Sequence, residues 1–164
     1  MEARALEKKA FDNVKGQIGY CGLWCGSCIV GNGTLQELTK RYRELVKGYG
    51  IDEWGLKEQG LDGEPFMNAL IAIENIPVCQ GCRKGGGNEI CTMRLCAREK
   101  NVSDCIECIE KATCRNLTPL ERVRTGAAKV GMLMKSERGQ PDIGEWVAEI
   151  GKKCPHCLIG IEKS

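Results

Sequence analysis

Histidine, aromatic residues and large apolar residues are scarce in this chain. Its 164 residues include three Trp, three Tyr, two Phe and a single histidine, His156. With no second histidine, and no pairing of a nucleophile with a base, hydrolase chemistry has little support, and we identify no catalytic residue. A core this poor in apolar residues must offset a backbone entropy of about 1–2 kcal/mol per residue. We therefore expect an additional source of stability.

Long hydrophobic runs are also missing. One of the longest is Ala69-Leu70-Ile71-Ala72-Ile73, which is far short of the ~20 residues of a membrane-spanning helix. The first nine residues contain no apolar segment of the kind found in secretory signals. We expect a cytoplasmic protein with reduced cysteines and no membrane association.

Strong charge of one sign is absent as well. The formal net charge is +2, and the basic residues near the cysteines alternate with glutamates. Binding to nucleic acid depends on clustered cationic contacts to phosphates. A nucleic-acid partner is therefore not favoured. Glu107 and Glu110, which flank cysteines, are expected on a solvated face.

Cysteine, by contrast, is abundant. Seven of the twelve cysteines lie between Cys79 and Cys114, and the chain contains several C-x-x-C pairs. Two sulfurs three positions apart can bind one ion, and a later pair can complete a tetrahedral zinc site. The candidate metal ligands are Cys21, Cys25, Cys28, Cys79, Cys82, Cys91, Cys96, Cys105, Cys108, Cys114, Cys154 and Cys157.

The spacing suggests how these cysteines could be grouped. Cys79, Cys82, Cys91 and Cys96 fall within 18 residues around a glycine-rich turn, and we expect them to form one site. The last three cysteines of the stretch, Cys105 to Cys114, need a fourth sulfur from residues 21–28 or from Cys154 and Cys157. Two or three zinc ions fit the total. A [4Fe-4S] cluster, which also takes four cysteines, is the alternative cofactor.

Two segments resemble enzyme motifs without their expected context. The spacing Cys21-x3-Cys25-x2-Cys28 matches the radical-SAM cluster motif, but the chain lacks the alternating strands of that fold. The same segment, and Cys154-Pro155-His156-Cys157, resemble thioredoxin active sites, which should follow a strand and open a helix. We predict that both are metal knuckles and that His156 points to solvent.

Helical patterns dominate the rest of the sequence. We predict a mainly α fold, a small helical domain with irregular cysteine-rich metal-binding loops. Residues 1–117 would form a metal-binding core with N-terminal helices, and residues 118–164 a helical extension packed onto it. Thr34 and Thr118 are predicted helix N-caps. The helix after Thr34 carries a stripe that we expect in the core: Leu35, Leu38, Tyr42, Leu45 and Tyr49. Further helices are predicted over 2–14, 51–58, 65–75, 92–100 and 118–136, and around Trp146.

The order of ten cysteines resembles a known prokaryotic family. The features are Cys21-Gly22-Leu23-x-Cys25-x2-Cys28, Cys79-x-Gly81-Cys82-Arg83, Cys91-x3-Leu95-Cys96-Ala97, then Cys105-x2-Cys108 and Cys114. They are similar to the uncharacterised family "domain of unknown function 3795", over residues 20 to about 116. The resemblance implies zinc binding and no defined reaction, and it leaves out Cys154 and Cys157.

These observations predict a cytosolic protein with structural four-cysteine zinc sites. It would act as a binding or adaptor module for a protein partner that the sequence does not identify. An iron–sulfur protein in electron transfer or redox sensing is the first alternative. A nucleic-acid-binding zinc protein is the second.

Overall fold

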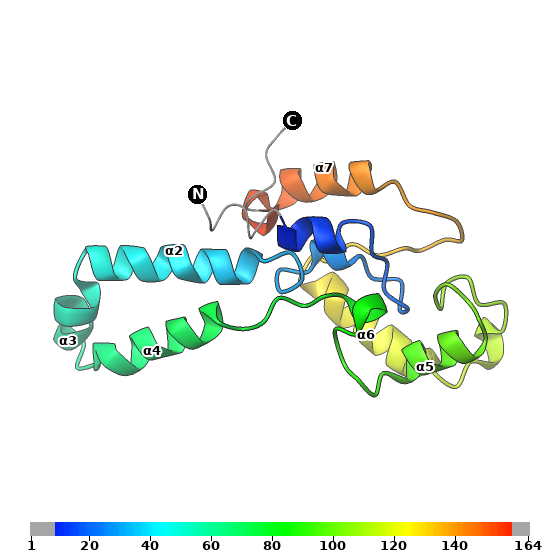
Figure 1. The fold of residues 1–164 in the computed structure, drawn as a ribbon, viewed down its shortest axis with the longest axis horizontal. Coiled ribbons are helices and arrows are strands. Elements are labelled where there is room, and N and C mark those ends of the chain that lie inside the picture. Colours follow the sequence, from blue (N-terminus) through cyan, green and yellow to red (C-terminus); the bar gives the residue numbers. More distant parts are fainter. Residues whose placement is uncertain (1–8, 159–164) are drawn as a thin grey trace.

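The computed structural model describes residues 9–158, and helices dominate it (Figure 1). Within that range only isolated antiparallel bridges occur, between Ile18 and Trp24 and between Leu23 and Met134. The prediction of a mainly α fold is confirmed. Of the predicted helix over 2–14, residues 9–14 are helical and the earlier ones lie outside the described range. The other helices are α2 (Thr34–Gly48), α3 (Leu56–Glu58), α4 (Gly63–Glu74), α5 (Thr92–Glu99), α6 (Leu117–Lys129) and α7 (Ile143–Lys153).

Short single turns of helix separate these elements. A π-helical turn, Ile51–Gly55, precedes α3. Four 3-10 turns lie in or beside cysteine segments: Cys25–Ser27, Cys82–Lys84, Lys111–Thr113 and Pro155–Leu158. No helix among the described residues is long and apolar enough to span a membrane.

The hydrophobic core is centred on Trp24, whose side chain is completely buried. Its ring meets Phe11 edge-on at 6.4 Å and lies 5.6 Å from the ring of Trp146 on α7. The indole N–H donates to the carbonyl oxygen of Lys15 over 2.7 Å, so its one polar group is satisfied. The core therefore joins the first cysteine segment to both the N-terminal helix and α7.

Because this core is small, Trp24→Ala should be severely destabilising. Removal of a fully buried tryptophan typically costs about 3–5 kcal/mol. Urea unfolding followed by circular dichroism would measure the loss. Trp54→Ala is the matched control, because Trp54 is 57% exposed, and it should change the free energy of unfolding little. Equal losses for the two variants would contradict the assignment of the core.

Helices α2 and α4 form an antiparallel pair, the helical arm (residues 34–74), which extends away from the cysteine-rich part (Figure 1). Helix α4 begins where the Asp62 carboxylate accepts from the Glu64 N–H over 3.0 Å. Arg43 on α2 pairs with Glu74 on α4 over 2.7 Å. The pair Tyr42 and Phe66 adds an edge-on ring contact at 6.5 Å.

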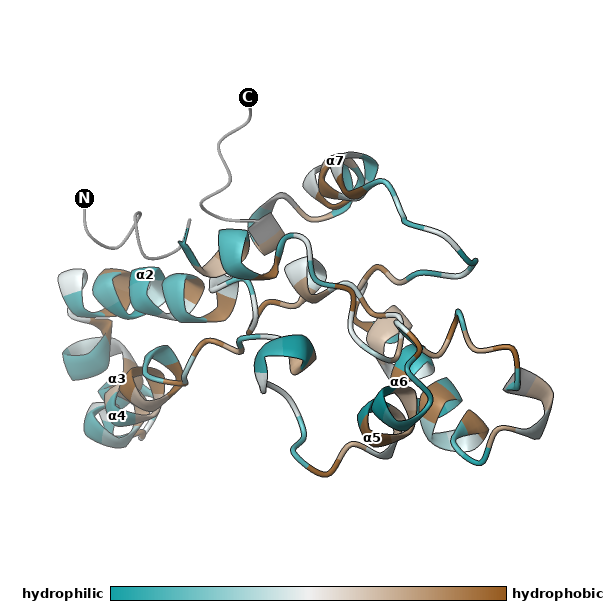
Figure 2. Cartoon of the chain, turned by 45° about the vertical axis from the view of Figure 1, so that its right-hand side comes forward, coloured by the Kyte–Doolittle hydropathy of each residue, from teal (hydrophilic) through white to brown (hydrophobic). Residues whose placement is uncertain are grey.

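The predicted core stripe on α2 is the main error of the fold prediction. Apart from the half-buried Leu35, its members are exposed: Leu38, Tyr42, Leu45 and Tyr49. Helical spacing shows which side chains share a face, but it does not show whether another element covers that face. Figure 2 shows apolar residues on both helices of the arm.

Two predicted N-caps are also shifted. Gly33, with φ of 82°, caps α2, while Thr34 is its first residue and its hydroxyl donates to the Cys157 carbonyl. Helix α6 is capped at Asn116 rather than Thr118, and it ends at Lys129 rather than Ser136. The chain must leave the helix there, because Leu133 and Lys135 pair with the backbone around Gly22 and Trp24.

Candidate metal centres

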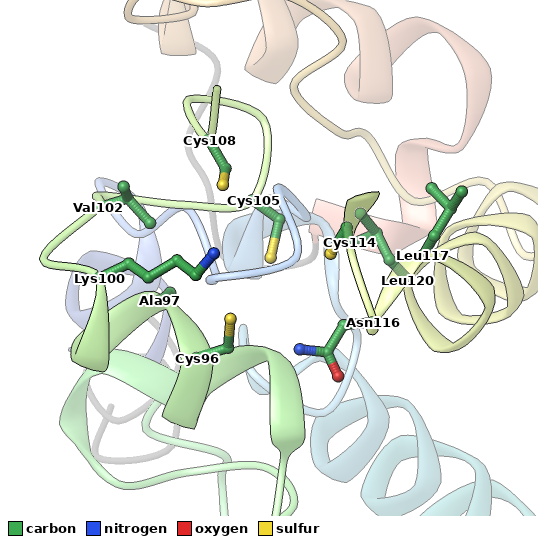
Figure 3. A pocket seen from close by; sticks show the side chains of 10 residues that line it. All are labelled: Cys96, Ala97, Lys100, Val102, Cys105, Cys108, Cys114, Asn116, Leu117 and Leu120. Carbon is green, nitrogen blue, oxygen red and sulfur yellow. The ribbon is translucent and has the colours of Figure 1, made fainter. Parts of the chain in front are cut away.

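Four cysteines converge on one small cavity, and we call them the Cys96 group: Cys96, Cys105, Cys108 and Cys114. Figure 3 shows their sulfurs directed toward a common space between α5 and the loop that follows it. The other walls are mostly apolar, from Ala97, Val102, Leu117 and Leu120. The volume is about 20 Å³, comparable to the space that a single water molecule requires.

Local hydrogen bonds shape the loop that carries Cys105 and Cys108. The Asp104 carboxylate accepts from the N–H groups of Ile106 and Glu107, at 2.8 and 3.0 Å, which forms the turn that an aspartate before such a segment favours. The Cys105 N–H donates to the Tyr20 carbonyl over 2.8 Å. The loop is thereby fixed against the first cysteine segment.

The pKa of one thiol in this group, that of Cys105, is raised. Burial, followed by the neighbouring sulfurs of Cys114, Cys21 and Cys96, raises the pKa of Cys105 to about 12. Several thiolates in one apolar space would repel each other, so at neutral pH without an ion the proton stays on this sulfur. A bound divalent cation would attract the thiolates and so offset their mutual repulsion.

A second set of sulfurs, the Cys82 group, comprises Cys21, Cys25, Cys79 and Cys82. Burial, and next the charge of Cys82, raises the pKa of Cys25 to about 12, with smaller contributions from Cys21 and Cys79. A side chain at Gly19 would place its Cβ 3.3 Å from the Cys82 sulfur and 3.7 Å from that of Cys21. The Tyr20 N–H points at the Cys82 sulfur over 3.4 Å.

Arg94 and a glycine hold the loop that follows Cys79. The buried Arg94 guanidinium donates to the carbonyls of Cys82 and Gly86, at 3.1 and 3.0 Å, and to that of Asn88. A Cβ on Gly86 would lie 2.9 Å from the Cys79 sulfur and 2.8 Å from the Gly81 nitrogen. Only glycine leaves room for so close an approach.

Basic residues near the cysteines make contacts within the chain. Arg83 donates to the Ile18 carbonyl over 2.6 Å and lies 4.7 Å from the centre of the Tyr20 ring. Lys100 pairs with Glu110, and the pKa of Lys100 is raised by this hydrogen bond and further by the nearby sulfurs of Cys96 and Cys108. These cations therefore do not form a free surface for phosphates.

A buried ion cluster connects the Cys105 loop to the chain after α6. Lys135 is 4% exposed at its side chain, and its ammonium lies 3.0 Å from the Asp104 carboxylate and also contacts Glu107. The Lys135 N–H donates to the Gly22 carbonyl over 2.8 Å. Glu107, predicted on a solvated face, is instead an ion-pair partner that also accepts from the Gly139 N–H over 2.9 Å.

Because Asp104 is buried, Lys135→Ala should be costly. Removing one partner of a buried ion pair leaves an uncompensated charge and typically costs about 3–5 kcal/mol. The measurement is the midpoint of urea unfolding. Lys153→Ala removes a cation from an exposed pair with Glu149 and should cost no more than about 0.5 kcal/mol. A Lys135→Ala variant as stable as Lys153→Ala would contradict the role of the cluster.

The grouping of sulfurs differs from the one expected from spacing. Cys96 lines the cavity with Cys105, Cys108 and Cys114, so the fourth sulfur of that set comes from α5. A sulfur from residues 21–28 is also close, because the charge of Cys21 contributes to the raised pKa of Cys105 after burial and Cys114, so the predicted ligand from that segment stays a prediction. Cys91 is the N-cap of α5 and lies near the Cys82 group, since its charge contributes to the raised pKa of Cys21, for which burial is the main cause.

Four predicted ligands lie outside both groups: Cys28, Cys91, Cys154 and Cys157. The sulfurs of Cys154 and Cys157 are joined in a disulfide, a state in which neither is a thiolate ligand, unlike the predicted metal knuckle. Cys28 is not among the residues that line the cavity or among those whose charge affects the pKa of Cys25. His156 is exposed, as predicted. Among residues 9–158, no group of three or more histidine, cysteine, aspartate or glutamate side chains is arranged so that it could hold a metal ion. Metal binding would therefore have to draw the sulfurs of a group closer together.

Several residues that shape these groups carry little sequence signal. Asp104 could have been identified from Ser103-Asp104 before a turn. Lys135 could not have been identified, because its partner Asp104 lies 31 residues away. Arg94 could not have been identified either, because its partners are backbone carbonyls. The same holds for Gln17, whose buried side chain donates to the Gln80 carbonyl over 3.0 Å.

Comparisons with known proteins identify the family. Neither curated proteins nor solved structures gave a match to the chain. A family model matches residues 17–119, a range that contains ten cysteines and both groups and excludes Cys154 and Cys157. The resemblance found in the sequence is thus confirmed. The chain belongs to the family described as Protein of unknown function (DUF3795).

Proposed function

We propose that this protein is a zinc-binding module whose two ions join its helices into one scaffold. The Cys96 group would hold one ion and the Cys82 group the other. One observation carries the proposal: four cysteines, from α5 and from the segment between α5 and α6, line a single cavity whose other walls are mostly apolar.

The donor chemistry fits a divalent cation. Cys21, Cys25 and Cys105 are half-buried, and the loss of solvent around their thiols is the largest cause of their raised pKa values. Zinc binding displaces such protons, and its free energy of binding becomes free energy of folding. That contribution would supply the stability that a core centred on Trp24 does not.

The spacing of the cysteines favours zinc over a cluster. Cys96, Cys105, Cys108 and Cys114 do not follow the C-x2-C-x2-C-x3-C spacing of bacterial ferredoxins. A zinc ion with four cysteine ligands has no open position for substrate. The ions would therefore be structural, and the protein a binding module rather than an enzyme.

A reducing compartment such as the cytoplasm suits this role. Ten of the twelve cysteines are unpaired, and thiols in such numbers persist where glutathione and thioredoxin keep them reduced. Both groups draw their sulfurs from these ten. The disulfide between Cys154 and Cys157 involves neither group.

Purification under anaerobic conditions tests the choice of cofactor. We expect a colourless protein with two zinc ions per chain by elemental analysis. A brown protein with iron and acid-labile sulfide would overturn the zinc proposal in favour of an iron–sulfur protein. The Cys28→Ser variant is the matched control and should retain both ions.

A further inference from the structure

A single disulfide lies in a chain that otherwise keeps its thiols free. Cys154 and Cys157 are bonded to each other, whereas the other ten cysteines are unpaired. Free thiols in such number persist under reducing conditions, where a disulfide is usually transient and either catalytic or redox-sensing. The bonded pair therefore calls for a role of its own.

The two bonded sulfurs differ in their surroundings. Cys157 packs against the core around Trp24. Cys154, the residue that follows α7, is half-buried and is not among the described residues that pack against this core. His156 between them is exposed, so solvent reaches the loop. A thiolate from outside would therefore reach the Cys154 sulfur more readily than the Cys157 sulfur.

One carbonyl fastens the bonded loop to the first cysteine segment. The Cys157 carbonyl oxygen accepts from the Asn32 side-chain amide over 2.9 Å and from the Thr34 hydroxyl over 3.0 Å. Both donors are buried, with exposed fractions of 2% and 1%. The same Asn32 amide donates to the Gly26 carbonyl over 3.0 Å, and the Asn32 Oδ1 accepts from the Thr34 N–H over 3.0 Å. The loop is therefore connected to the backbone that leads from Gly26 into α2.

The disulfide helps to hold this carbonyl in place. The covalent bond and the Cys157 N–H, which donates to the Cys154 carbonyl over 2.9 Å, together close the turn that presents it. Reduction removes the covalent closure and leaves the weaker hydrogen bond. The position of the Asn32 side chain thus depends on the state of the two sulfurs.

We propose that Cys154 and Cys157 form a reversible redox site that exchanges with a dithiol reductant. The oxidised pair fastens the last turn to Asn32 and Thr34, and reduction releases it. Neither sulfur belongs to the Cys96 group or the Cys82 group, so the redox site is independent of the proposed zinc ions.

The exchange proceeds in two displacements. A thiolate of the reductant attacks the Cys154 sulfur, the bond between the two cysteines breaks, and Cys157 leaves as a thiolate that takes up a proton. The second thiol of the reductant loses its proton and attacks the reductant's own sulfur in the mixed disulfide. Cys154 then leaves as a thiolate and takes up a proton. Two electrons and two protons pass to the pair, and the reductant becomes a disulfide.

Peptide mapping of the full zinc-loaded chain tests the exchange. Cleavage after lysine yields residues 154–163, a peptide that contains both cysteines and no other. We expect it to be bonded in protein purified in air, doubly alkylated after dithiothreitol, and bonded again in oxidised dithiothreitol. A pair that resists excess dithiothreitol, or that stays reduced because it holds a third zinc ion by elemental analysis, would overturn the proposal.

Single variants test which sulfur is attacked. The Cys154 thiol of Cys157→Ser should react with iodoacetamide about 10-fold faster than the Cys157 thiol of Cys154→Ser, because Cys157 lies against the core. Labelling of the same peptide in urea gives the reference rates of the unfolded chain. Equal rates in the folded variants would overturn the order of attack.

Hydrogen exchange tests the connection to the first cysteine segment. Reduction should speed exchange in residues 26–34 by about 10-fold, because the Thr34 N–H depends on Asn32 as its acceptor. Exchange in α4 should not change. A double variant, Cys154→Ala with Cys157→Ala, should exchange like the reduced chain with or without dithiothreitol. Unchanged exchange on reduction, or an equal response of the double variant to dithiothreitol, would overturn the connection.

Discussion

Cys105→Ser is expected to release one of two zinc ions and to lower the free energy of unfolding by at least about 3 kcal/mol. A structural zinc site contributes an apparent ~10–16 kcal/mol to folding, and a hydroxyl is a poor substitute for a thiolate. The Cys105 sulfur lines the cavity together with those of Cys96, Cys108 and Cys114. Native mass spectrometry would count the ions, and urea unfolding would measure the stability.

The matched control for this variant is Cys28→Ser. It makes the same chemical change in a cysteine that neither lines the cavity nor affects the pKa of Cys25. Both ions and nearly all of the stability should remain. If Cys28→Ser lost an ion while Cys105→Ser kept two, the assignment of the Cys96 group would be wrong.

Complete removal of metal should abolish cooperative unfolding. The buried apolar residues near the Cys96 group are few, chiefly Met93, Ala97, Ile106 and Leu120. They cannot balance the entropy of ordering α5, the cysteine loop and α6. Near-ultraviolet circular dichroism during a thermal melt, before and after chelation, measures the effect. A melt that is unchanged after verified loss of metal would contradict this prediction, because it would show that the hydrophobic core folds the chain without metal.

Helix positions were the most predictable feature of this chain. Apolar residues at helical spacing predicted the positions of α4 and α7 closely. Helix α5 lies within the predicted range 92–100. Boundaries were predicted less well. Helix α6 stops at Lys129 because residues 133–135 pair with Gly22 and Trp24, and local patterns contain no information about a partner more than 100 residues away.

The grouping of the cysteines shows where spacing in sequence is insufficient. Cys91 and Cys96 are five positions apart at and beyond the start of α5. At 3.6 residues per turn, side chains five apart point about 140° away from each other. Cys96 therefore lines the cavity while Cys91 does not, and the predicted helix over 92–100 could have indicated this difference. That Cys96 lies beside Cys105 and Cys108 could be seen only once the fold of the loop was known.

The exposed stripe on α2 has a different origin. The periodicity of Leu38, Tyr42, Leu45 and Tyr49 predicted a shared apolar side correctly. Its assignment to the core was wrong because the pattern shows which residues share a side and not what covers that side. The position of the arm, away from the Trp24 core, leaves the side exposed.

The grouping of the sulfurs is tested most directly by correlating bound metal with cysteine protons. In protein loaded with cadmium-113, a two-dimensional spectrum links each ion to the β-protons of its cysteine ligands. We predict one ion coupled to Cys96, Cys105, Cys108 and Cys114, and a second coupled to Cys21, Cys25, Cys79 and Cys82. Coupling of Cys96 to the same ion as Cys79 and Cys82 would contradict the assignment.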